Sequence, residues 1–522
     1  MSRVRIGYGR DLAIGLAAVA SVTAYVVAAA ALDAVGFPLD DSWIHQTYAR
    51  NLAQHGEWAF VPGEPSTAST SPLFTVLLAA GYALKLPFFA WTFALGASFL
   101  AGAGWINARL AETLFPSLRR AGLWTGLMTV LAWHLTWAAA SGMEIMLFAL
   151  LALAVIGLAW RELPGAGVLR DSVPAFRRGA LLGLVGAALT LTRPEGALLL
   201  GLAGLFGAIA FLGSASSRRT GVVWGFGIAL GWGVGVTPYA ALSIHLSGEP
   251  LPSTASAKQA EYAASLAAPL IERVWWMVRP LAAGGQIALL PGLIAAFYWI
   301  ARQGGGARVA LRWLPAVWAV AHVALYALRL PAPYQHGRYV QPVLPVVILY
   351  GIGGTLHLVR GAQRRMASRV LARSLALSAL AVTLGFWVIG AQAYAADVRI
   401  INTEMVAAAR WAERHIPDDA LLAAHDIGAL GYYAPRPLFD LAGLVTPEVV
   451  PIIRDHEALM ALMCQRGARY LMALPDQRPA AEDDPRLGGA PVFVTGAPYA
   501  PAAGSGNMAI YALDWGAGCG AP

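Results

Sequence analysis

Long apolar runs alternate along the chain with short clusters of arginine. The runs at 12–32, 221–244 and 374–393 carry almost no charge, and each is about as long as the roughly 20 residues that cross a bilayer as a helix. The pattern predicts a mainly α-helical, multi-span bundle with about 10 to 13 transmembrane helices. Residues 12–35 are predicted to be a retained first helix, because no convincing signal-peptide cleavage site follows the run.

The arginine clusters predict how the bundle is oriented, since cytoplasmic loops of membrane proteins are rich in Lys and Arg. Arg3, Arg5 and Arg10 precede the first helix. Five further clusters are expected in the cytoplasm: Arg109, Arg119 and Arg120; Arg161, Arg170, Arg177 and Arg178; Arg218 and Arg219; Arg302, Arg308 and Arg312; and Arg360, Arg364, Arg365, Arg369 and Arg373. The N-terminus is then cytoplasmic, and these segments lie outside: 36–71, 141–144, 193–196, 247–282, 331–340 and everything after about 397.

Two apolar segments do not fit a simple alternation of crossings. Only one of 72–86 and 88–108 can cross between an outer loop and the cytoplasmic Arg109, and the first, about 15 residues long, is predicted to be short or re-entrant. Residues 180–213 form either one long helix or a hairpin of two short ones. Arginine clusters on both sides favour the hairpin.

After residue 396 the long apolar runs end, and the chain divides into a membrane domain (1–396) and a water-soluble tail (397–522). The tail predicts a small α/β domain on the outer face. Its expected strands are 421–425, 438–441, 470–473, 492–495 and 508–513, with a helix over 458–466. Cys464 and Cys519 would lie in an oxidising compartment there and either pair or stay unpaired.

Composition narrows the class of protein. Hydrophobic residues make up 58% of the 522 residues and charged residues 13%, against about 25% charged in soluble proteins, so a soluble enzyme is excluded. The net charge of +8 reflects membrane topology and not nucleic-acid binding, because the arginines lie between apolar runs. Two cysteines without a CxxC or HExxH pattern leave only an oxygen-bound metal.

The first outer loop (36–71) carries the most informative residues. Asp40 and Asp41 are adjacent carboxylates at the membrane surface. Burial there raises the pKa of a carboxyl group, and mutual repulsion separates the pKa values of the two. One of them could act as a general base. Apolar and polar residues then alternate at helical spacing over about 43–54, which predicts an amphipathic helix lying in the interface. Alternatively, Asp40 and Asp41 only cap this helix.

Short motifs follow in order along the chain: AspAsp at 40–41, TyrAlaArgAsnLeu at 48–52, ValProGlyGluPro at 61–65, ThrSerProLeu at 70–73, SerGlyMetGlu at 141–144, LeuThrArgProGluGly at 191–196, LeuProSerThrAlaSerAlaLys at 251–258, GlnHisGlyArgTyrValGlnProValLeuPro at 335–345, AspIleGlyAlaLeuGlyTyrTyr at 426–433 and AspLeuAlaGlyLeuVal at 440–445. These motifs, in this order along the chain, resemble those of the GT-C glycosyltransferases. The resemblance is closest to the bacterial branch that includes the mycobacterial terminal arabinofuranosyltransferase.

The resemblance implies a bacterial inner-membrane enzyme that moves one sugar from a polyprenyl-phosphate carrier to a glycan, lipid or protein acceptor at the outer face. It implies that an Asp of the first outer loop, Asp40 or Asp41, is the catalytic base. Some relatives use a divalent cation, so a Mg, Mn or Ca ion at Asp40 and Asp41 stays open. Ser253 stands where the family usually has Asn, which puts an amide contact to the sugar there in doubt.

The chemistry of such a reaction points to further residues. A departing polyprenyl phosphate gains negative charge, so cations are needed at the outer surface, and Arg193, Lys258 and Arg338 are the candidates. Lys258 and Lys85 are the only lysines of the chain. His336 and Tyr339 flank Arg338 and complete the expected substrate-binding set. Glu144 and Glu195, at the outer ends of apolar helices, are expected to bind sugar hydroxyls or a cation.

Two other functions remain open on the sequence alone. A transporter or flippase of a lipid-linked or sugar substrate would share the composition and the basic loops, although no internal repeat is found and polar residues gather at the outer helix ends. A GT-C scaffold that only binds a lipid-linked sugar is a second alternative. Neither the sugar nor the acceptor follows from the residues.

Overall fold

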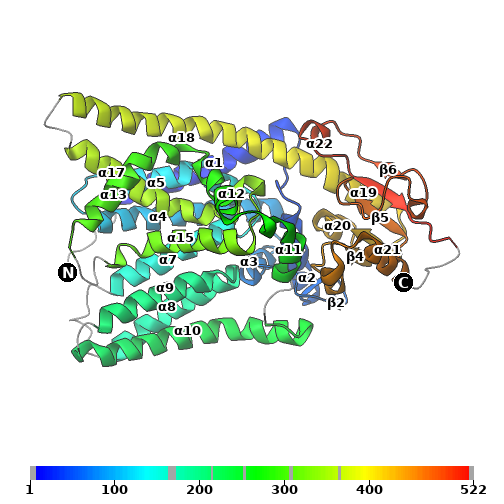
Figure 1. The fold of residues 1–522 in the computed structure, drawn as a ribbon, viewed down its shortest axis with the longest axis horizontal. Coiled ribbons are helices and arrows are strands. Elements are labelled where there is room, and N and C mark those ends of the chain that lie inside the picture. The colour runs from blue at the N-terminus through cyan, green and yellow to red at the C-terminus, as the bar shows by residue number, and fades with distance from the viewer. Residues whose placement is uncertain are drawn as a thin grey trace.

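The computed structural model describes residues 7–162, 172–212, 215–250, 254–304, 310–361 and 366–516. They form an elongated molecule in which a bundle of long helices is capped at one end by a smaller domain of strands and short helices (Figure 1). Arg3, Arg5, Arg170, Arg308, Arg364 and Arg365 of the predicted cytoplasmic clusters, and Ser253, lie outside the described residues.

Six stretches of the described chain are long and apolar enough to cross a bilayer. They contain α1 (Tyr8–Leu32), α4 (Phe88–Leu114), α8 (Ser172–Thr192), α10 (Ala215–Ser247), α17 (Leu344–Gly361) and α18 (Met366–Ile401). Two bent pairs add up to two more: α6 (Trp133–Ala140) with α7 (Ile145–Glu162), bent by 118°, and α12 (Leu270–Ala282) with α13 (Leu290–Ala301), bent by 95°. The chain is a multi-pass membrane protein.

Four shorter apolar helices complete the bundle: α3 (Pro72–Ala83), α5 (Ala121–Leu131), α9 (Gly196–Leu212) and α15 (Leu314–Arg329). With the six long stretches and the two bent pairs, at least two of these helices would have to cross for the described chain to reach the expected total of about 10 to 13 spans. Helix α3 has 12 residues and is about 18 Å long, less than the ~30 Å hydrocarbon core, as predicted for 72–86. Helices α8 and α9 meet at a turn, so the described part of 180–213, up to Leu212, forms the predicted hairpin.

Glycines let α8 pack closely against α10. A Cβ atom at Gly179 would lie 2.1 Å from the carbonyl oxygen of Trp224, and one at Gly183 would lie 2.2 Å from that of Ile228. Any larger residue would therefore push the two backbones apart. Small residues at a close helix crossing are a common way to hold membrane helices together.

The predicted helix of the first outer loop is α2 (Asp41–His55), but its surroundings differ from the prediction. Its apolar Trp43 and its polar Gln46 and Asn51 are all buried, and Gln46 donates a 2.9 Å hydrogen bond to Thr92. An amphipathic helix in the interface would leave its polar side to water. The exposed polar side that the prediction implied is therefore not observed, because periodicity does not distinguish water from polar protein groups. The place of α2 at the membrane surface stays a prediction.

The C-terminal domain is built on a five-stranded sheet of order β4-β3-β5-β7-β6. Its strands are β3 (Leu422–Ala424), β4 (Leu438–Asp440), β5 (Tyr470–Ala473), β6 (Phe493–Val494) and β7 (Ala509–Ala512). Strand β3 lies parallel to β4 and β5, and β7 lies antiparallel to β5 and β6. All five strands and α21 (His456–Gln465) fall within about two residues of the predicted segments, so the α/β prediction for the tail is confirmed.

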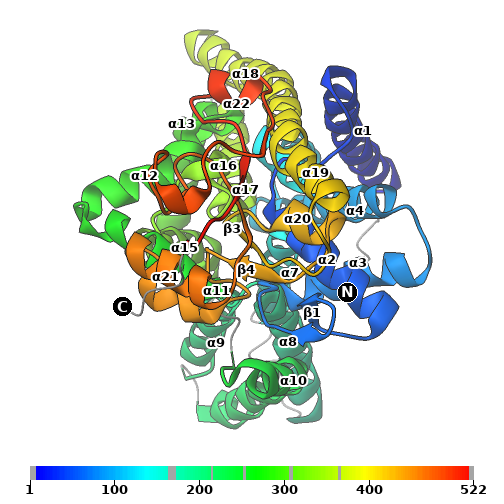
Figure 2. The same ribbon diagram turned by 90° about the vertical axis from the view of Figure 1, so that its right-hand side faces the viewer.

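Short elements fill the space between the bundle and this sheet. They are the hairpin of β1 (Ala59–Val61) and β2 (Glu64–Pro65), α11 (Thr254–Glu261), α16 (Tyr334–Gly337), α19 (Ala407–His415), α20 (Gly428–Tyr433) and α22 (Tyr499–Ala502). Figure 2 looks onto the C-terminal domain and shows α20 beside α2.

Helix α18 continues into the C-terminal domain through a π-helical turn, η6 (Asn402–Val406), that leads directly into α19. Glu404 of this turn is fully buried. Its carboxylate accepts hydrogen bonds from the Met508 amide (2.8 Å), from Asn507 Nδ2 (3.1 Å) and from the Thr495 hydroxyl. Cys464 is buried in α21. Cys519, with which it was expected either to pair or not, lies outside the described residues.

Candidate active site

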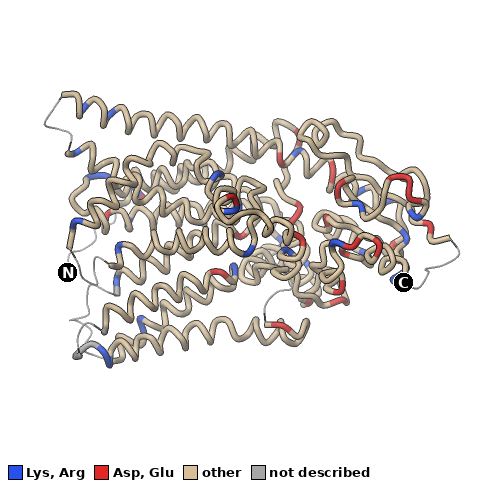
Figure 3. Tube along the Cα trace, viewed as in Figure 1, with Lys and Arg blue, Asp and Glu red and all other residues tan. Residues whose placement is uncertain are grey.

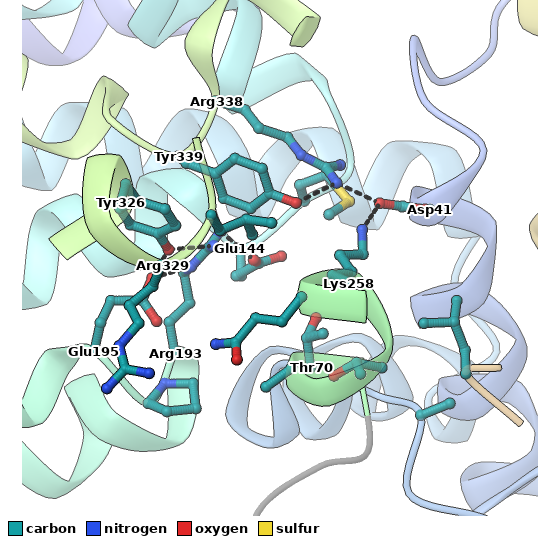
Figure 4. A pocket seen from close by; sticks show the side chains of 18 of the residues that line it. Asp41, Thr70, Glu144, Arg193, Glu195, Lys258, Tyr326, Arg329, Arg338 and Tyr339 are labelled. Carbon is teal, nitrogen blue, oxygen red and sulfur yellow. Dashed lines mark hydrogen bonds and ion pairs between the residues drawn. The ribbon is translucent and has the colours of Figure 1, made fainter. Parts of the chain in front are cut away.

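Asp41, Lys258 and Arg338 meet where the bundle faces the C-terminal domain. Asp41 begins α2, Lys258 lies on α11 and Arg338 follows α16. Oδ2 of Asp41 accepts hydrogen bonds from Arg338 Nη2 at 2.7 Å and from Lys258 Nζ at 3.0 Å (Figure 4). Burial alone would raise the pKa of Asp41, but the two positive charges outweigh burial and hold that pKa well below its usual range.

These three residues line a cavity of about 350 Å³, called the first cavity below. Most of its exposed wall is apolar, and its polar lining combines four basic side chains with three carboxylates. The charged and tyrosine side chains in its wall are Asp41, Glu144, Arg193, Glu195, Lys258, Tyr326, Arg329, Arg338 and Tyr339. The cavity therefore offers a mainly apolar space with a small excess of positive charge.

Arg193 is the centre of a second polar cluster in this cavity. It donates to Glu144 at 3.0 Å, to Glu195 at 2.6 Å and to the Tyr326 hydroxyl at 2.8 Å, and Tyr326 in turn donates to Glu195. Its guanidinium also lies 5.1 Å from the centre of the Tyr339 ring. Arg193 thus ties the α8–α9 turn to α15.

Arg338 keeps unused hydrogen-bonding capacity. Its Nη2 contacts Asp41 and, at 3.1 Å, the Tyr339 hydroxyl. Its Nε and Nη1 are buried and have no hydrogen-bond partner among the described residues. Because buried N–H groups without an acceptor are costly, these two nitrogens are suited to an anion that enters the cavity.

A strained turn carries Arg338 into this position. Gln335, His336 and Gly337 have successive φ values of +52°, +58° and +71°, and non-glycine residues in this left-handed region cost about 1–3 kcal/mol each. His336 Nε2 lies 2.8 Å from Asp397 Oδ2 on α18, which also accepts a 2.9 Å bond from Trp137 Nε1. The His336–Asp397 contact therefore holds the turn against α18.

Asp40 has different partners from its neighbour. Its Oδ2 accepts a hydrogen bond from the Gly428 amide at 2.6 Å, and its Oδ1 accepts one from the Ala429 amide at 2.8 Å. Burial, reinforced by the negative charge of Asp426, raises the pKa of Asp40 to about 8 despite these bonds. Both oxygens are engaged with the start of α20, so Asp40 fastens the first outer loop to the C-terminal domain.

A second cavity of about 510 Å³ lies between α11, α16 and the C-terminal domain. It shares Asp41, Ile44, Lys258, Arg338 and Leu444 with the first cavity, and Asp40 lines it as well. Most of its exposed wall is polar. Asp41 and its two basic partners thus stand in the wall common to a mainly apolar cavity and a mainly polar one.

Seven of the nine residues singled out from the sequence line the first cavity: Asp41, Glu144, Arg193, Glu195, Lys258, Arg338 and Tyr339. Asp40 lines only the second cavity, and His336 lines neither. The sequence analysis missed Tyr326, Arg329 and Asp397. Tyr326 and Arg329 stand three positions apart in an apolar helix, on one face, and this spacing was the available signal.

Asp40 and Asp41 do not fit the divalent-cation site that the sequence left open. Asp40 is used by backbone amides, and Asp41 is paired with two cations, so each carboxylate already has a partner that an ion would have to displace. No group of three or more His, Cys, Asp and Glu side chains in the described part of the chain could share a metal ion.

The fold is that of the GT-C glycosyltransferases, and the predicted resemblance is confirmed at this level. ArnT from Cupriavidus metallidurans bound to undecaprenyl phosphate matches with a TM-score of 0.60 and 15% identity, over 97% of this chain and 98% of that one. The oligosaccharyltransferase of Archaeoglobus fulgidus in its apo form matches with a TM-score of 0.58 and 12% identity, over 91% and 70%.

The arabinofuranosyltransferase AftD from Mycobacteria has a TM-score of 0.51 and 17% identity, and the match covers 98% of this chain but 40% of AftD. A family model described as a domain of unknown function (DUF8728) matches residues 399–511, which contain the five-stranded sheet up to Tyr511. No curated protein sequence is significantly similar to the chain.

Proposed function

We propose that this protein is a membrane glycosyltransferase that moves a monosaccharide from a polyprenyl-phosphate carrier to a cell-envelope glycan, lipid or protein acceptor. The observation that carries the proposal is the position of Asp41 in the wall between two cavities, held by Arg338 and Lys258. The GT-C fold and the ArnT structure with undecaprenyl phosphate support it.

The first cavity is the proposed donor site. A polyprenyl phosphate has an apolar chain and a phosphate, and the cavity combines a mainly apolar wall with Arg329, Arg338 and Lys258. Arg329 is exposed at the end of α15 and has no ion-pair partner among the described residues. Arg338 supplies two unpaired buried nitrogens. Arginine holds phosphate oxygens through paired N–H groups, so both arginines are proposed phosphate ligands.

Asp41 is the proposed catalytic base, because Asp40 is engaged at both oxygens by α20. When the donor phosphate binds, it competes with Asp41 for Arg338 and Lys258, and loss of these contacts makes the carboxylate more basic. Asp41 then takes the proton of the acceptor hydroxyl, whose oxygen forms a bond to the anomeric carbon. The bond from that carbon to the phosphate oxygen breaks, and the phosphate leaves with the electron pair next to Arg338.

Arg193, Glu144 and Glu195 are proposed to bind the sugar of the donor. All three lie in the wall of the first cavity, where the carboxylate oxygens of Glu144 and Glu195 can accept hydrogen bonds from the hydroxyl groups of a sugar. Their mutual hydrogen bonds fix their orientation before the donor enters, which lowers the cost of ordering the site. Tyr339 positions Arg338 through its hydroxyl.

The proposal includes the orientation in a bacterial inner membrane. Arginines gather at the loop ends of the bundle that lie far from the C-terminal domain (Figure 3), as expected for a cytoplasmic side. The N-terminus would then be cytoplasmic, residues 1–396 would form the catalytic membrane domain, and residues 397–522 would lie on the outer face. The expected partners are the bilayer, the lipid-linked donor and the acceptor. A nucleic acid is not expected to bind.

The test is mass spectrometry of the purified protein incubated with a panel of polyprenyl-phosphate sugars and an envelope extract as the source of acceptor. Release of polyprenyl phosphate by the wild type, and its loss in Asp41→Asn, is the expected result. Asp419→Asn, at an exposed carboxylate of the C-terminal domain, is the matched control.

Two results would contradict the proposal. Full release by Asp41→Asn would remove the assigned base, and no release of polyprenyl phosphate from any donor of the panel by a folded wild-type protein would remove the transferase itself. Movement of an intact lipid-linked sugar across the bilayer of a vesicle, without release, would instead favour the flippase alternative.

A further inference from the structure

We infer that the second cavity is a saccharide site, which binds the uncharged, hydroxyl-rich end of a glycan acceptor next to Asp41. The inference rests on the proposed transfer reaction, because it names the class of acceptor for that reaction. It is carried by the cavity's place at the sheet, by the side chains in its wall and by its charge.

The cavity lies at the carboxyl ends of all three parallel strands of the C-terminal sheet. His425 and Asp426 follow β3, Leu441 follows β4, and Asp476 and Gln477 follow β5, and all five residues line the cavity. In open α/β sheets, ligands bind in the crevice outside the carboxyl ends of parallel strands. The sheet thus presents a ligand site to the bundle, where α11 and α16 close it.

The polar groups of the wall match the hydrogen-bonding needs of a sugar. Glu261, Asp426 and Asp476 contribute carboxylates, which accept hydrogen bonds from hydroxyl groups. His425 bridges two of them, at 3.7 Å from Glu261 and 3.4 Å from Asp426. These groups come from α11 and from the ends of two strands, so they converge on one space from different elements.

Gln335 leaves one hydrogen-bond acceptor of this wall without a donor. Its side-chain Oε1 is buried and has no partner among the described residues, although the residue lines the cavity and sits at a strained φ of +52°. A buried amide oxygen without a partner costs about 1–3 kcal/mol. A ligand hydroxyl would satisfy it.

Two tyrosines contribute aromatic surface to the wall of the cavity. The rings of Tyr262 and Tyr334 stack at 5.4 Å with 19° between their planes, and both residues line the cavity. Aromatic rings offer rigid apolar area together with a polar hydroxyl, which suits the apolar face of a pyranose or furanose ring.

Charge separates this ligand from the alternatives. Among the lining residues five carboxylates face three Lys or Arg side chains. Burial raises the pKa of Asp40 to about 8. Against the effect of burial, Asp426 and Glu261 raise the pKa of His425 to about 9, so the charges of the wall nearly balance. No excess of positive charge then favours an anionic lipid headgroup. Fourteen of the 24 lining residues are polar, which disfavours an apolar lipid chain. An uncharged saccharide fits both observations.

The test is saturation-transfer NMR on the full-length protein in nanodiscs, so that no sugar-based detergent competes. The probes are uncharged methyl glycosides of pyranose and furanose sugars, with glycerol phosphate and a neutral peptide as comparisons. We expect transfer to at least one methyl glycoside, reduced at least fivefold in Asp426→Asn and in Gln335→Ala. Asp476→Asn, at an exposed residue, tests the same wall with little risk to folding, and Asp483→Asn outside both cavities is the control.

The inference is overturned if no methyl glycoside shows saturation transfer, or if the three variants bind the glycoside like the wild type. It is also overturned if only glycerol phosphate or the peptide binds and the three variants abolish that binding. The release of polyprenyl phosphate is measured on the same samples. Release without glycoside binding refutes the saccharide site and leaves the transferase proposal standing. Glycoside binding without release of polyprenyl phosphate refutes the transferase proposal and leaves the saccharide site standing.

Discussion

Arg338 donates a 2.7 Å hydrogen bond to Asp41 across 297 positions of the chain. This contact joins the first outer loop to the segment before α17, and it places the proposed base beside the proposed phosphate ligand. Because Lys258 shares the same carboxylate oxygen, the donor phosphate and Asp41 compete for the same two cations. The chemistry of the site is therefore tested most directly at these three residues.

Asp41→Asn should abolish most of the transfer. The amide cannot accept the acceptor proton, and general-base catalysis contributes about 10²–10⁴-fold, so release of polyprenyl phosphate should fall by about that factor. The measurement is the initial rate of release by mass spectrometry. A rate within about threefold of wild type, well below the 10²–10⁴ range, would show that another group is the base.

Lys258→Met should change the pH dependence of transfer. In the wild type, Lys258 and Arg338 hold the pKa of Asp41 low against the effect of burial, so the base stays ionised far into the acid range. Removal of one cation raises that pKa, and the acid limb of the kcat/KM profile should move to higher pH. Lys85→Met, at the only other lysine, should leave the limb in place.

Asp40 should make the stability of the protein fall with rising pH. Its pKa is raised to about 8 in the folded state, chiefly by burial, and is about 4 in an unfolded chain. The folded protein thus binds the extra proton between these values, so stability decreases as pH rises from about 4 through about 8. Thermal unfolding of Asp40→Asn should lose this slope; an unchanged slope would assign it to other groups.

Glu404→Ala should destabilise the C-terminal domain. The substitution leaves the Met508 amide and the Asn507 side chain without their buried acceptor, at a cost of about 1–3 kcal/mol for each donor that stays unsatisfied. The unfolding midpoint should drop, and Glu404→Gln, which keeps one oxygen acceptor, should drop less. Equal midpoints for the three proteins would show that the domain does not depend on this carboxylate.

Asp397→Ala should impair donor binding without removing a group from either cavity. It releases His336 and Trp137, so the strained turn no longer fixes Arg338. We expect KM for the donor to rise about tenfold, which corresponds to about 1.4 kcal/mol, with kcat less affected. Asp397→Asn keeps an acceptor and should restore most of the affinity. A rise in KM shared equally by both variants would contradict a positioning role.

Much of the fold could be predicted because its signals are local. Apolar periodicity and turn residues located the five strands and α21. Seven of the residues that the motifs and the chemistry of the reaction singled out line one cavity. The partners of Asp41 could not be predicted, since Lys258 and Arg338 are 217 and 297 positions away. Local periodicity also missed the burial of α2 and the role of Tyr326, whose polar group is a single atom in an apolar run.

The unbroken passage from α18 through η6 into α19 has a mechanical consequence. A helix that continues from the bundle into the C-terminal domain leaves no flexible hinge on that side, and Glu404 and Asp40 clamp the domain at two further places. The walls of the second cavity are therefore fixed relative to each other. We expect an acceptor to enter from the side of the cavity, without movement of the C-terminal domain away from the bundle.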